Sequence, residues 1–516
     1  MSKTAKAAIW IMLATMLSKI LGFVREQVLA YYYGTSMVKD VFVLTVGIPG
    51  LIIAIIGSAV ATTFIPLYFQ SKEKKGDEGA LKFTNNILNI CYVIAIIIAI
   101  VGLLFTKQFV TVFAVGFRSD PEKFAMAVKF TRIMISGVLF ISGSKLIGAY
   151  LQVNNSFAIP SLVGLPYSII IILSTIVSAV TNKLYILPVG ALIAMASQLI
   201  FQLPFAKKLS YKYEAYINFK DDSIKKMLSM IMPMLLGVSI GQINVYVDKL
   251  LATTLATGKL SALDYASKLN DFVIALFVTS IVTAVYPKLS KLTNKKDKKG
   301  FIETVVTSSN FIILVVLPIS VGFIVFAEPI VRILFERGKF NAESTQLTRT
   351  ALRLYATGLT FLGIRDILYR VFYSMGDTKT PMINSSIALI CNIVLNFTLI
   401  KPFGYKGLAF STSIATMITV ALLFVSLQKK SGYFGEKLII STGIKSLGAS
   451  IVMAFCALFI YKFLYAYLGT GMIKELVSVG VASVVGALLY LGIIVLLKVK
   501  EVNMLFNVLK QGKKKL

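Results

Sequence analysis

Residues 16–34 read MLSKILGFVREQVLAYYYG, an apolar stretch that contains Lys19, Arg25 and Glu26. With the residues before it, the stretch is long enough to cross a bilayer, which takes about 20 apolar residues in a helix. A charge at the centre of such a helix costs at least about 2.5–3.5 kcal/mol, so charges there are rare and mark functional sites. The stretch therefore predicts a membrane-spanning helix and a site that uses buried charge.

The rest of the chain continues the apolar pattern almost from end to end. Its 516 residues are 57% hydrophobic and only 15% charged, and the mean hydropathy is +0.82. A soluble domain carries about 25% charged residues, so the composition argues against a cytosolic enzyme. The sequence has no histidine, and its three cysteines stand apart within apolar stretches. Neither a histidine-based site nor a disulfide framework is indicated.

The basic residues are distributed unevenly. There are 53 lysines and arginines against 23 acidic residues, a formal net charge of +30. In a soluble protein this excess would suggest nucleic acid. Here the lysines concentrate in alternate connections between apolar stretches, namely 72–82, 207–226, 288–299, 429–445 and the C-terminal tail. The positive-inside rule explains this pattern and places both termini in the cytoplasm.

The hydropathy predicts an all-α polytopic membrane protein with about 14 transmembrane helices. The expected spans are 7–33, 38–70, 84–106, 125–152, 158–181, 184–205, 226–254, 263–290, 302–327, 345–375, 380–400, 406–428, 443–468 and 472–498. Two amphipathic stretches, 107–118 and 328–335, are not counted as spans. An even number of helices puts the two termini on one side, in agreement with the charge pattern.

An internal repeat suggests how the spans are organised. Arg25, Gly34 and Asp40 match Lys249, Gly258 and Asp264 at one constant offset. We therefore expect two six-helix lobes related by a pseudo-twofold axis, 1–205 and 226–428. The last two helices, 443–498, and a basic cytoplasmic tail, 499–516, follow. Such lobes usually enclose a substrate site near mid-membrane and give alternating access to it.

Further charges lie within or at the ends of the predicted spans. Asp40 opens the second span, and Lys268 and Asp271 lie in the eighth. Around Lys19 and Arg25 the cations outnumber the anions, and a surplus of buried cation favours an anionic ligand such as a phosphate or pyrophosphate. The alternative is that these charges pair as structural salt bridges or extend to the membrane interface.

Several segments resemble a known family. The segments are SKILGFVREQVLAYYYG (18–34), DVFVLTVGIPGL (40–51), LFERGKF (334–340), FYSMGDTKTP (372–381) and NIVLNFTLIKPFGYKGLAFSTSIA (392–415). Together they are similar to the MurJ/MviN family of the multidrug/oligosaccharidyl-lipid/polysaccharide exporter superfamily. That family flips lipid II, the undecaprenyl-pyrophosphate-linked precursor of peptidoglycan. The resemblance covers the whole chain and implies two six-helix lobes, a cationic cavity, and a lipid-tail groove formed by the last two helices.

The resemblance also implies which residues bind substrate. The cavity residues would be Lys19, Arg25, Glu26, Asp40, Lys268 and Asp271. Two positions depart from the family, because Ile53 stands where an arginine is expected and Lys268 replaces another. Lysine keeps the positive charge but lacks the two-pronged guanidinium that matches a phosphate. The departures leave open whether the cargo is lipid II or a related glycan.

Some members of the family resemble sodium-coupled transporters, which implies a sodium site here. Its ligands would be Asp248, Asn392, Asn396, Thr412 and the backbone carbonyl of Leu408. Oxygen ligands suit a small hard cation. The alternative is that these polar groups bond across helices and hold them together. The resemblance implies no other cofactor.

The resemblance implies a transporter and not an enzyme. Lipid II would pass from the cytoplasmic to the outer leaflet of the inner membrane, driven by the membrane potential or an ion gradient. The alternatives are a flippase for another polyprenyl-linked glycan (capsule or exopolysaccharide) and a cation-coupled drug antiporter, whose cavity would be acidic or aromatic. The expected partners are lipid II, membrane lipids and the cell-wall synthesis machinery, with no nucleic acid, and we expect a monomer.

Overall fold

The computed structural model describes residues 3–469 and 471–501. The side chains of residues 3–13, 52–56, 58–62 and 232–240 lie outside that description, as does most of the predicted basic tail. Every regular element in the described residues is helical. The chain divides into two compact units, Met1–Ser261 with Arg337–Phe340, and Ala262–Glu336 with Asn341–Leu516.

Long apolar helices dominate both units. Among the described residues, nine helices are long and apolar enough to cross a membrane, and a tenth candidate is a pair of helices that meet at a 44° bend. A helix satisfies its backbone hydrogen bonds internally, which is a requirement for any segment that crosses lipid. The predicted all-α membrane protein is confirmed at this level.

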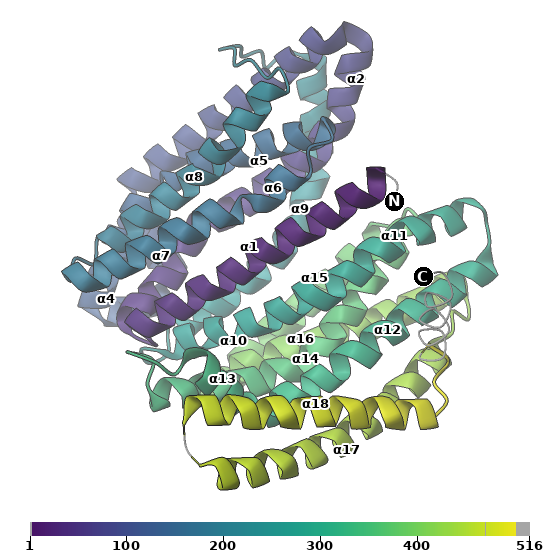
Figure 1. The fold of residues 1–516 in the computed structure, drawn as a ribbon. Coiled ribbons are helices and arrows are strands. Elements are labelled where there is room, and N and C mark those ends of the chain that lie inside the picture. The colour runs from purple at the N-terminus through teal and green to yellow at the C-terminus, as the bar shows by residue number, and fades with distance from the viewer. Residues whose placement is uncertain (1–2, 470, 502–516) are drawn as a thin grey trace. The chain divides into compact units, whose positions relative to one another are not determined.

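The first unit is built around its second helix. Its helices are α1 (Lys3–Tyr33), α2 (Met37–Leu104), α3 (Thr106–Phe113), η1 (Val115–Ser119), α4 (Pro121–Met134), α5 (Gly137–Val153), α6 (Ala158–Leu162), α7 (Gly164–Thr181), α8 (Ile186–Lys208) and α9 (Asp222–Ala252). Helix α2 packs against α5 and α9, while α1 lies along α6 and α7 (Figure 1). The amphipathic stretch 107–118 forms the short helices α3 and η1.

Helix α2 joins two predicted spans without an irregular loop. The expected connection 72–82 is helical on both sides of Gly76, whose φ of 68° and ψ of −168° break the helix at one residue. Glycine adopts this left-handed backbone without a Cβ clash. The sequence predicted a connection here but not that both spans would continue as helix into it.

An asparagine ladder holds the segment between α8 and α9 against α2. Asn86 donates from Nδ2 to the Asn218 carbonyl (2.9 Å) and accepts from the Asn218 N–H (2.8 Å). Asn85 donates to the Lys212 carbonyl (2.8 Å), and Asn89 donates to the Glu214 carbonyl (2.9 Å). All three asparagines are buried. This irregular segment therefore satisfies its backbone groups on α2 instead of in a helix or sheet.

The second unit contains the remaining helices. They are α10 (Lys259–Val273, which begins in the first unit), η2 (Ile274–Val278, a π-helical turn), α11 (Thr279–Asn294), α12 (Lys298–Val325), α13 (Ala327–Phe335), α14 (Ala342–Ser374), α15 (Lys379–Phe403), α16 (Tyr405–Ser431), α17 (Glu436–Leu468) and α18 (Met472–Leu496). Its apolar core lies among α11, α12, α14 and α16.

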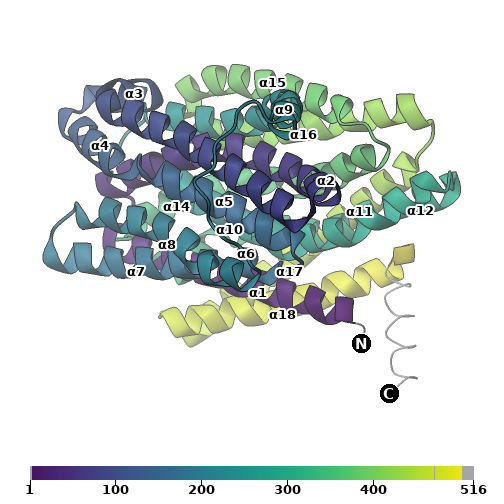
Figure 2. The ribbon, with the colours of Figure 1, turned by 90° about the horizontal axis from the view of Figure 1, so that it is seen from above.

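The last two helices form a hairpin on α12. Helices α17 and α18 pack against each other, and α17 packs along α12 (Figure 1 and Figure 2). The Tyr490 hydroxyl donates to the Leu314 carbonyl of α12 (3.0 Å) and lies 2.7 Å from the Ser446 hydroxyl of α17. One buried tyrosine of α18 thus joins three helices, since a tyrosine offers both an apolar ring and a polar tip.

Candidate functional site

Arg25, Glu26 and Lys39 form a charged trio where α1 and α2 meet. The guanidinium of Arg25 donates to Glu26 Oε1 (2.8 Å from Nη2), and Lys39 Nζ donates to Glu26 Oε2 (3.0 Å). The side chains of Lys39 and Glu26 are 2% and 7% exposed, whereas Arg25 keeps 21%. Two cations contact one carboxylate, and Arg25 is the most exposed member of the trio.

Tyr167 contacts Arg25 of the trio, and Lys19 lies on the same helix as Arg25. The Arg25 guanidinium carbon lies 5.4 Å from the centre of the Tyr167 ring of α7, a cation–π distance. Lys19 lies on α1 six residues before Arg25, and it is exposed. The structure therefore brings Arg25 and Glu26 together and leaves Lys19 at the surface of the same helix.

Asp40 is the centre of a second, buried cluster, which we call the Asp40 corner: Asp40, Lys123, Gly258 and Ser261. Asp40 Oδ2 accepts from Lys123 Nζ (2.9 Å) and from the Gly258 N–H (2.8 Å), and Oδ1 accepts from the Ser261 N–H (2.9 Å). Asp40 is 1% exposed and Lys123 4%. An anion is favourable at a helix N-terminus, and this carboxylate serves the first turns of both α2 and α10.

A short segment from later in the chain belongs to the first unit beside α1. The Lys339 N–H donates to the Tyr31 carbonyl at the end of α1 (2.8 Å). Gly34, with φ of 51°, approaches so closely that a Cβ there would lie 2.3 Å from the Lys339 carbonyl oxygen. Any larger residue at Gly34 would displace this segment.

The predicted cavity residues of α10 belong to the second unit. Lys268 is half-buried and Asp271 is exposed, and residues three apart lie on one face of a helix. Directly after them the helix passes through the π turn η2. Such turns often occur at functional sites, and nothing in the apolar sequence of residues 274–278 signals one. The side chain of Ile53 lies outside the described part of the structure.

The proposed sodium ligands of α15 and α16 make local hydrogen bonds. Asn392 and Asn396 are both fully buried, and Asn396 Nδ2 donates to Asn392 Oδ1 (2.9 Å). Thr412 Oγ1 donates to the Leu408 carbonyl (3.0 Å). Asp248 is half-buried on α9, in the first unit. The described residues contain no group of three or more acidic or cysteine side chains placed to hold a metal ion.

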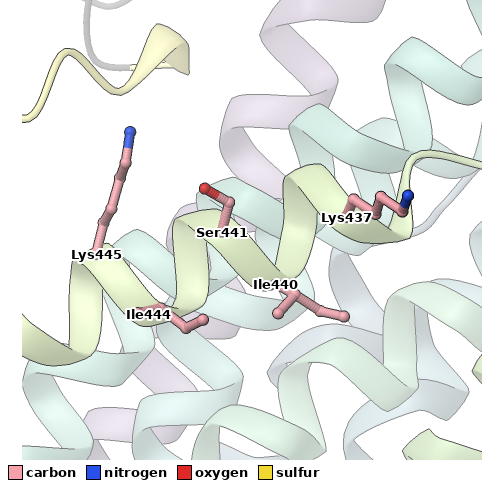
Figure 3. A pocket seen from close by; sticks show the side chains of 5 residues that line it. All are labelled: Lys437, Ile440, Ser441, Ile444 and Lys445. Atoms are coloured by element: carbon pink, nitrogen blue, oxygen red, sulfur yellow. The ribbon is translucent and has the colours of Figure 1, made fainter.

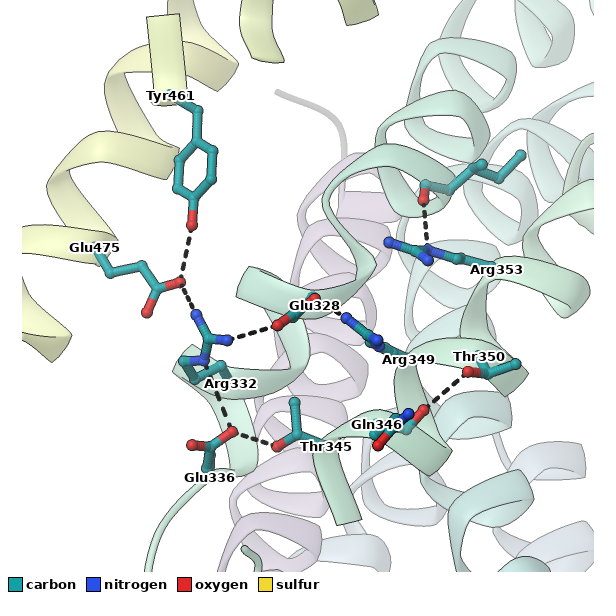
Figure 4. Close-up of polar contacts among 11 residues, drawn as sticks. Glu328, Arg332, Glu336, Thr345, Gln346, Arg349, Thr350, Arg353, Tyr461 and Glu475 are labelled. Atoms are coloured by element: carbon teal, nitrogen blue, oxygen red, sulfur yellow. Dashed lines mark hydrogen bonds and ion pairs between the residues drawn. The ribbon is translucent and has the colours of Figure 1, made fainter. Parts of the chain in front are cut away.

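A charged network in the second unit was not predicted from the sequence. Arg332 of α13 donates to Glu475 of α18 (2.8 Å) and to Glu328 of its own helix (2.6 Å). Glu328 also pairs with Arg349 of α14, and the Tyr461 hydroxyl of α17 donates to Glu475 (3.0 Å) (Figure 4). The network joins α13, α14, α17 and α18.

In this network, burial and the neighbouring charge shift the pKa of Arg332 in opposite directions. Glu475 is only 3% exposed. Burial alone would lower the pKa of the Arg332 guanidinium, but the charge of Glu475 and its hydrogen bond outweigh burial and raise the pKa. The sequence shows that the stretch 328–335 is amphipathic but does not indicate what its charged residues contact. Its partner, 143 residues further on, gave no sequence signal.

Comparison with known proteins identifies the fold and the family. The model of the family described as "Lipid II flippase MurJ" matches residues 29–482. The "Probable lipid II flippase MurJ" of Vibrio cholerae is 28% identical, with 95% of this chain and 96% of the relative covered. That of Buchnera aphidicola subsp. Schizaphis graminum is 30% identical over 89% and 90%. The "Lipid II flippase MurJ" of Burkholderia cenocepacia is 26% identical over 85% and 87%.

Solved structures give the same result. A structure titled "Lipid II flippase MurJ, inward closed conformation" superposes with a TM-score of 0.79 at 27% identity, covering 93% of this chain and 98% of the other. A multidrug transporter of the MATE family in an inward-facing conformation has a TM-score of 0.67 at 14% identity, covering 83% and 99%. At that identity the likeness concerns the fold alone.

Proposed function

The chain belongs to the lipid II flippase MurJ family, and from this membership we propose that it carries lipid II from the cytoplasmic to the outer leaflet. It is an integral protein of the inner membrane and a transporter, not an enzyme. The curated relatives cover almost the whole chain and are named for this activity.

The observation that best supports an anionic cargo is the charged trio. The Arg25 guanidinium lies beside Glu26 and has the largest exposure of the three side chains. A guanidinium can bind a phosphate through two parallel hydrogen bonds. We assign Arg25 as the group that meets the pyrophosphate, and Lys19, Lys268 and Asp271 remain candidate members of the same binding surface.

We further propose that transport proceeds by alternating access and that the Asp40 corner must open during it. The corner joins connections that the charge pattern places on the outer side of the membrane, among them 34–37 and 255–262. Its hydrogen bonds to Gly258 and Ser261 tie α2 to the first turn of α10. Breaking these bonds would free the outer ends of both helices.

For the topology we propose 14 spans in two six-helix lobes plus the α17–α18 hairpin, with both termini in the cytoplasm. Each expected span falls on helical residues, with 38–70 and 84–106 both on α2. The repeat finds local support, because the matched Gly34 and Gly258 both have positive φ and the matched Asp40 and Asp264 are both buried.

We propose that membrane potential or an ion gradient drives transport. An anionic cargo moving outward gains about 2.3 kcal/mol per charge per 100 mV from an inside-negative potential. A sodium ion held by Asp248, Asn392, Asn396, Thr412 and the Leu408 carbonyl would be the coupling ion. Sodium-independent transport together with an unchanged Asp248→Ala variant would rule this ion out.

Complementation tests the central proposal. Cells depleted of their own lipid II flippase should grow when they express the wild-type chain and fail to grow with Arg25→Ala at equal protein levels. Arg25→Lys, which keeps the charge, should restore part of the growth. Growth with Arg25→Ala would refute the role of Arg25. Failure of the wild type would favour the alternative cargo, another polyprenyl-linked glycan.

A further inference from the structure

One end of α17 carries an open surface pocket of about 430 Å³. Its lining residues are Lys437, Ile440, Ser441, Ile444 and Lys445, with the two lysines at opposite ends (Figure 3). The five positions follow the three- and four-residue spacing of a single helical face. The pocket therefore has one lysine at each end of its lining and two isoleucines between them along the helix.

The acidic residues at this end of the hairpin form no ion pair with either lysine of the pocket within the described residues. Glu436 accepts from the Phe434 N–H (3.2 Å), and the buried Glu501 accepts from Asn310 Nδ2 (2.7 Å). Lys437 is exposed and makes no ion pair within the described residues. Lys445 donates to the uncharged Leu497 carbonyl at the end of α18 (3.1 Å). Both lysines keep their positive charge available.

An apolar stripe continues from the pocket along α17. Ile444 is 68% exposed, Phe455 71% and Phe459 74%, and their spacing keeps them near one face. Helix α17 is among those apolar enough to cross a membrane. A ligand that fits this surface has an anionic head and an extended apolar tail.

We propose that the Lys437–Lys445 pocket binds an anionic glycerophospholipid of the phosphatidylglycerol class. The phosphate binds at the lysine-bearing end of α17, within reach of the flexible Lys437 and Lys445 side chains, and an acyl chain follows Ile444, Phe455 and Phe459. On the orientation proposed above, the lipid belongs to the cytoplasmic leaflet, where lysines at the ends of membrane helices attract anionic lipid. The proposed ligand is a resident lipid of the membrane.

Native mass spectrometry of the purified full chain tests the proposal. Phosphatidylglycerol and phosphatidylcholine with matched acyl chains are added separately to the detergent-solubilised protein, and the bound fraction of each is measured. The wild type should retain phosphatidylglycerol preferentially. Each lysine near an anionic lipid contributes about 1 kcal/mol, about fivefold in affinity, so Lys437→Gln/Lys445→Gln should lose about 25-fold. Lys437→Arg/Lys445→Arg should bind like the wild type.

The matched control is Lys462→Gln/Lys474→Gln, which removes two exposed charges from the opposite end of the same hairpin. Three results would overturn the proposal. The control could lose phosphatidylglycerol to the same extent, the wild type could bind phosphatidylcholine equally well, or Lys437→Gln/Lys445→Gln could bind phosphatidylglycerol like the wild type. A dimer mass abolished by the pocket substitutions would also overturn it, because the face would then be a protein contact. Because Lys445 also bonds to Leu497, Lys437→Gln alone should still cost about fivefold. The readout is independent of lipid II transport.

Discussion

Asp40 joins parts of the chain that are far apart in sequence. Its carboxylate is buried with Lys123, 83 residues away, and with the start of α10, more than 200 residues away. The sequence indicated that Asp40 was a charge at a helix start and that a repeat linked this region to Gly258. It could not predict that Lys123 would be buried against Asp40, because Lys123 lies in a polar stretch that is typical of a solvent-exposed connection.

Asp40→Asn should therefore lower stability strongly. Removing one member of a buried ion pair leaves the other charge uncompensated and costs about 3–5 kcal/mol. Thermal unfolding in detergent should show the loss, and Asp40→Asn/Lys123→Met should recover most of it. The exposed pair Glu78–Lys82 provides the control, since Glu78→Gln should change stability by less than about 1 kcal/mol. A double variant no more stable than Asp40→Asn would contradict the pairing.

Asp377 gives a pH-dependent prediction. It lies between α14 and α15, where burial alone would raise its pKa, but hydrogen bonds from Lys430 and Thr380 outweigh burial and lower the pKa to about 2. A lowered folded-state pKa stabilises the protein above the unfolded value of about 4, and this stabilisation is lost as the pH falls toward 2. The difference in Tm between wild type and Asp377→Asn should therefore be largest at pH 5–7 and shrink between pH 4 and 2.

The fully exposed Asp222 provides the comparison for Asp377. Asp222→Asn should leave Tm nearly unchanged at every pH, because its side chain is solvated in both states. If the Tm difference between wild type and Asp377→Asn stays constant down to pH 2, the hydrogen bond from Lys430 does not lower the pKa of Asp377.

At the scale of elements, the polar network fixes how α18 attaches to its unit. Apart from α17, helix α18 contacts α12 and α13, and the Arg332–Glu475 pair is the charged link of α18 to α13. The amphipathic character of residues 328–335 was evident from the sequence, and α13 confirms that this stretch is helical. The contact of Arg332 with Glu475 depends on where α18 packs in the folded unit, and no local sequence pattern determines that.

Glu475→Gln should loosen the hairpin without unfolding the unit. A hydrogen bond to a charged group contributes about 1.5–3 kcal/mol, so amide exchange in the first turns of α18 should accelerate at least about tenfold. Exchange in α14 and α16 should stay unchanged. The neighbouring exposed residue Lys474 serves as the control, and Lys474→Gln should have no effect. Equal acceleration in both variants would mean that the ion pair does not hold α18.

At the scale of the whole molecule, the charge pattern predicts the orientation. Alkaline phosphatase fused after the last residue should be inactive, whereas green fluorescent protein at the same point should fluoresce, because both termini are expected in the cytoplasm. A fusion within 182–183, a connection on the opposite side, should give the reverse result. An active phosphatase at the C-terminus would overturn the assignment.

Hydropathy located the long helices well because burial in lipid imposes a simple length and composition. It missed local breaks: the 44° bend between α4 and α5 and the π turn after α10. These depend on packing and on single hydrogen bonds, and the apolar residues around them are compatible with a straight helix. The sequence indicated the candidate cavity residues by their charge, but it did not indicate which residue each of them contacts.

The position of residues 337–340 has a consequence for biogenesis. These residues complete the first unit, yet they are made 79 residues after Ser261, its last preceding residue. At about 5–20 residues per second, synthesis of that stretch takes about 4–16 s. Until Lys339 is made, the Tyr31 carbonyl has no Lys339 N–H to accept from, so this end of the first unit can be completed only after the later segment has been synthesised.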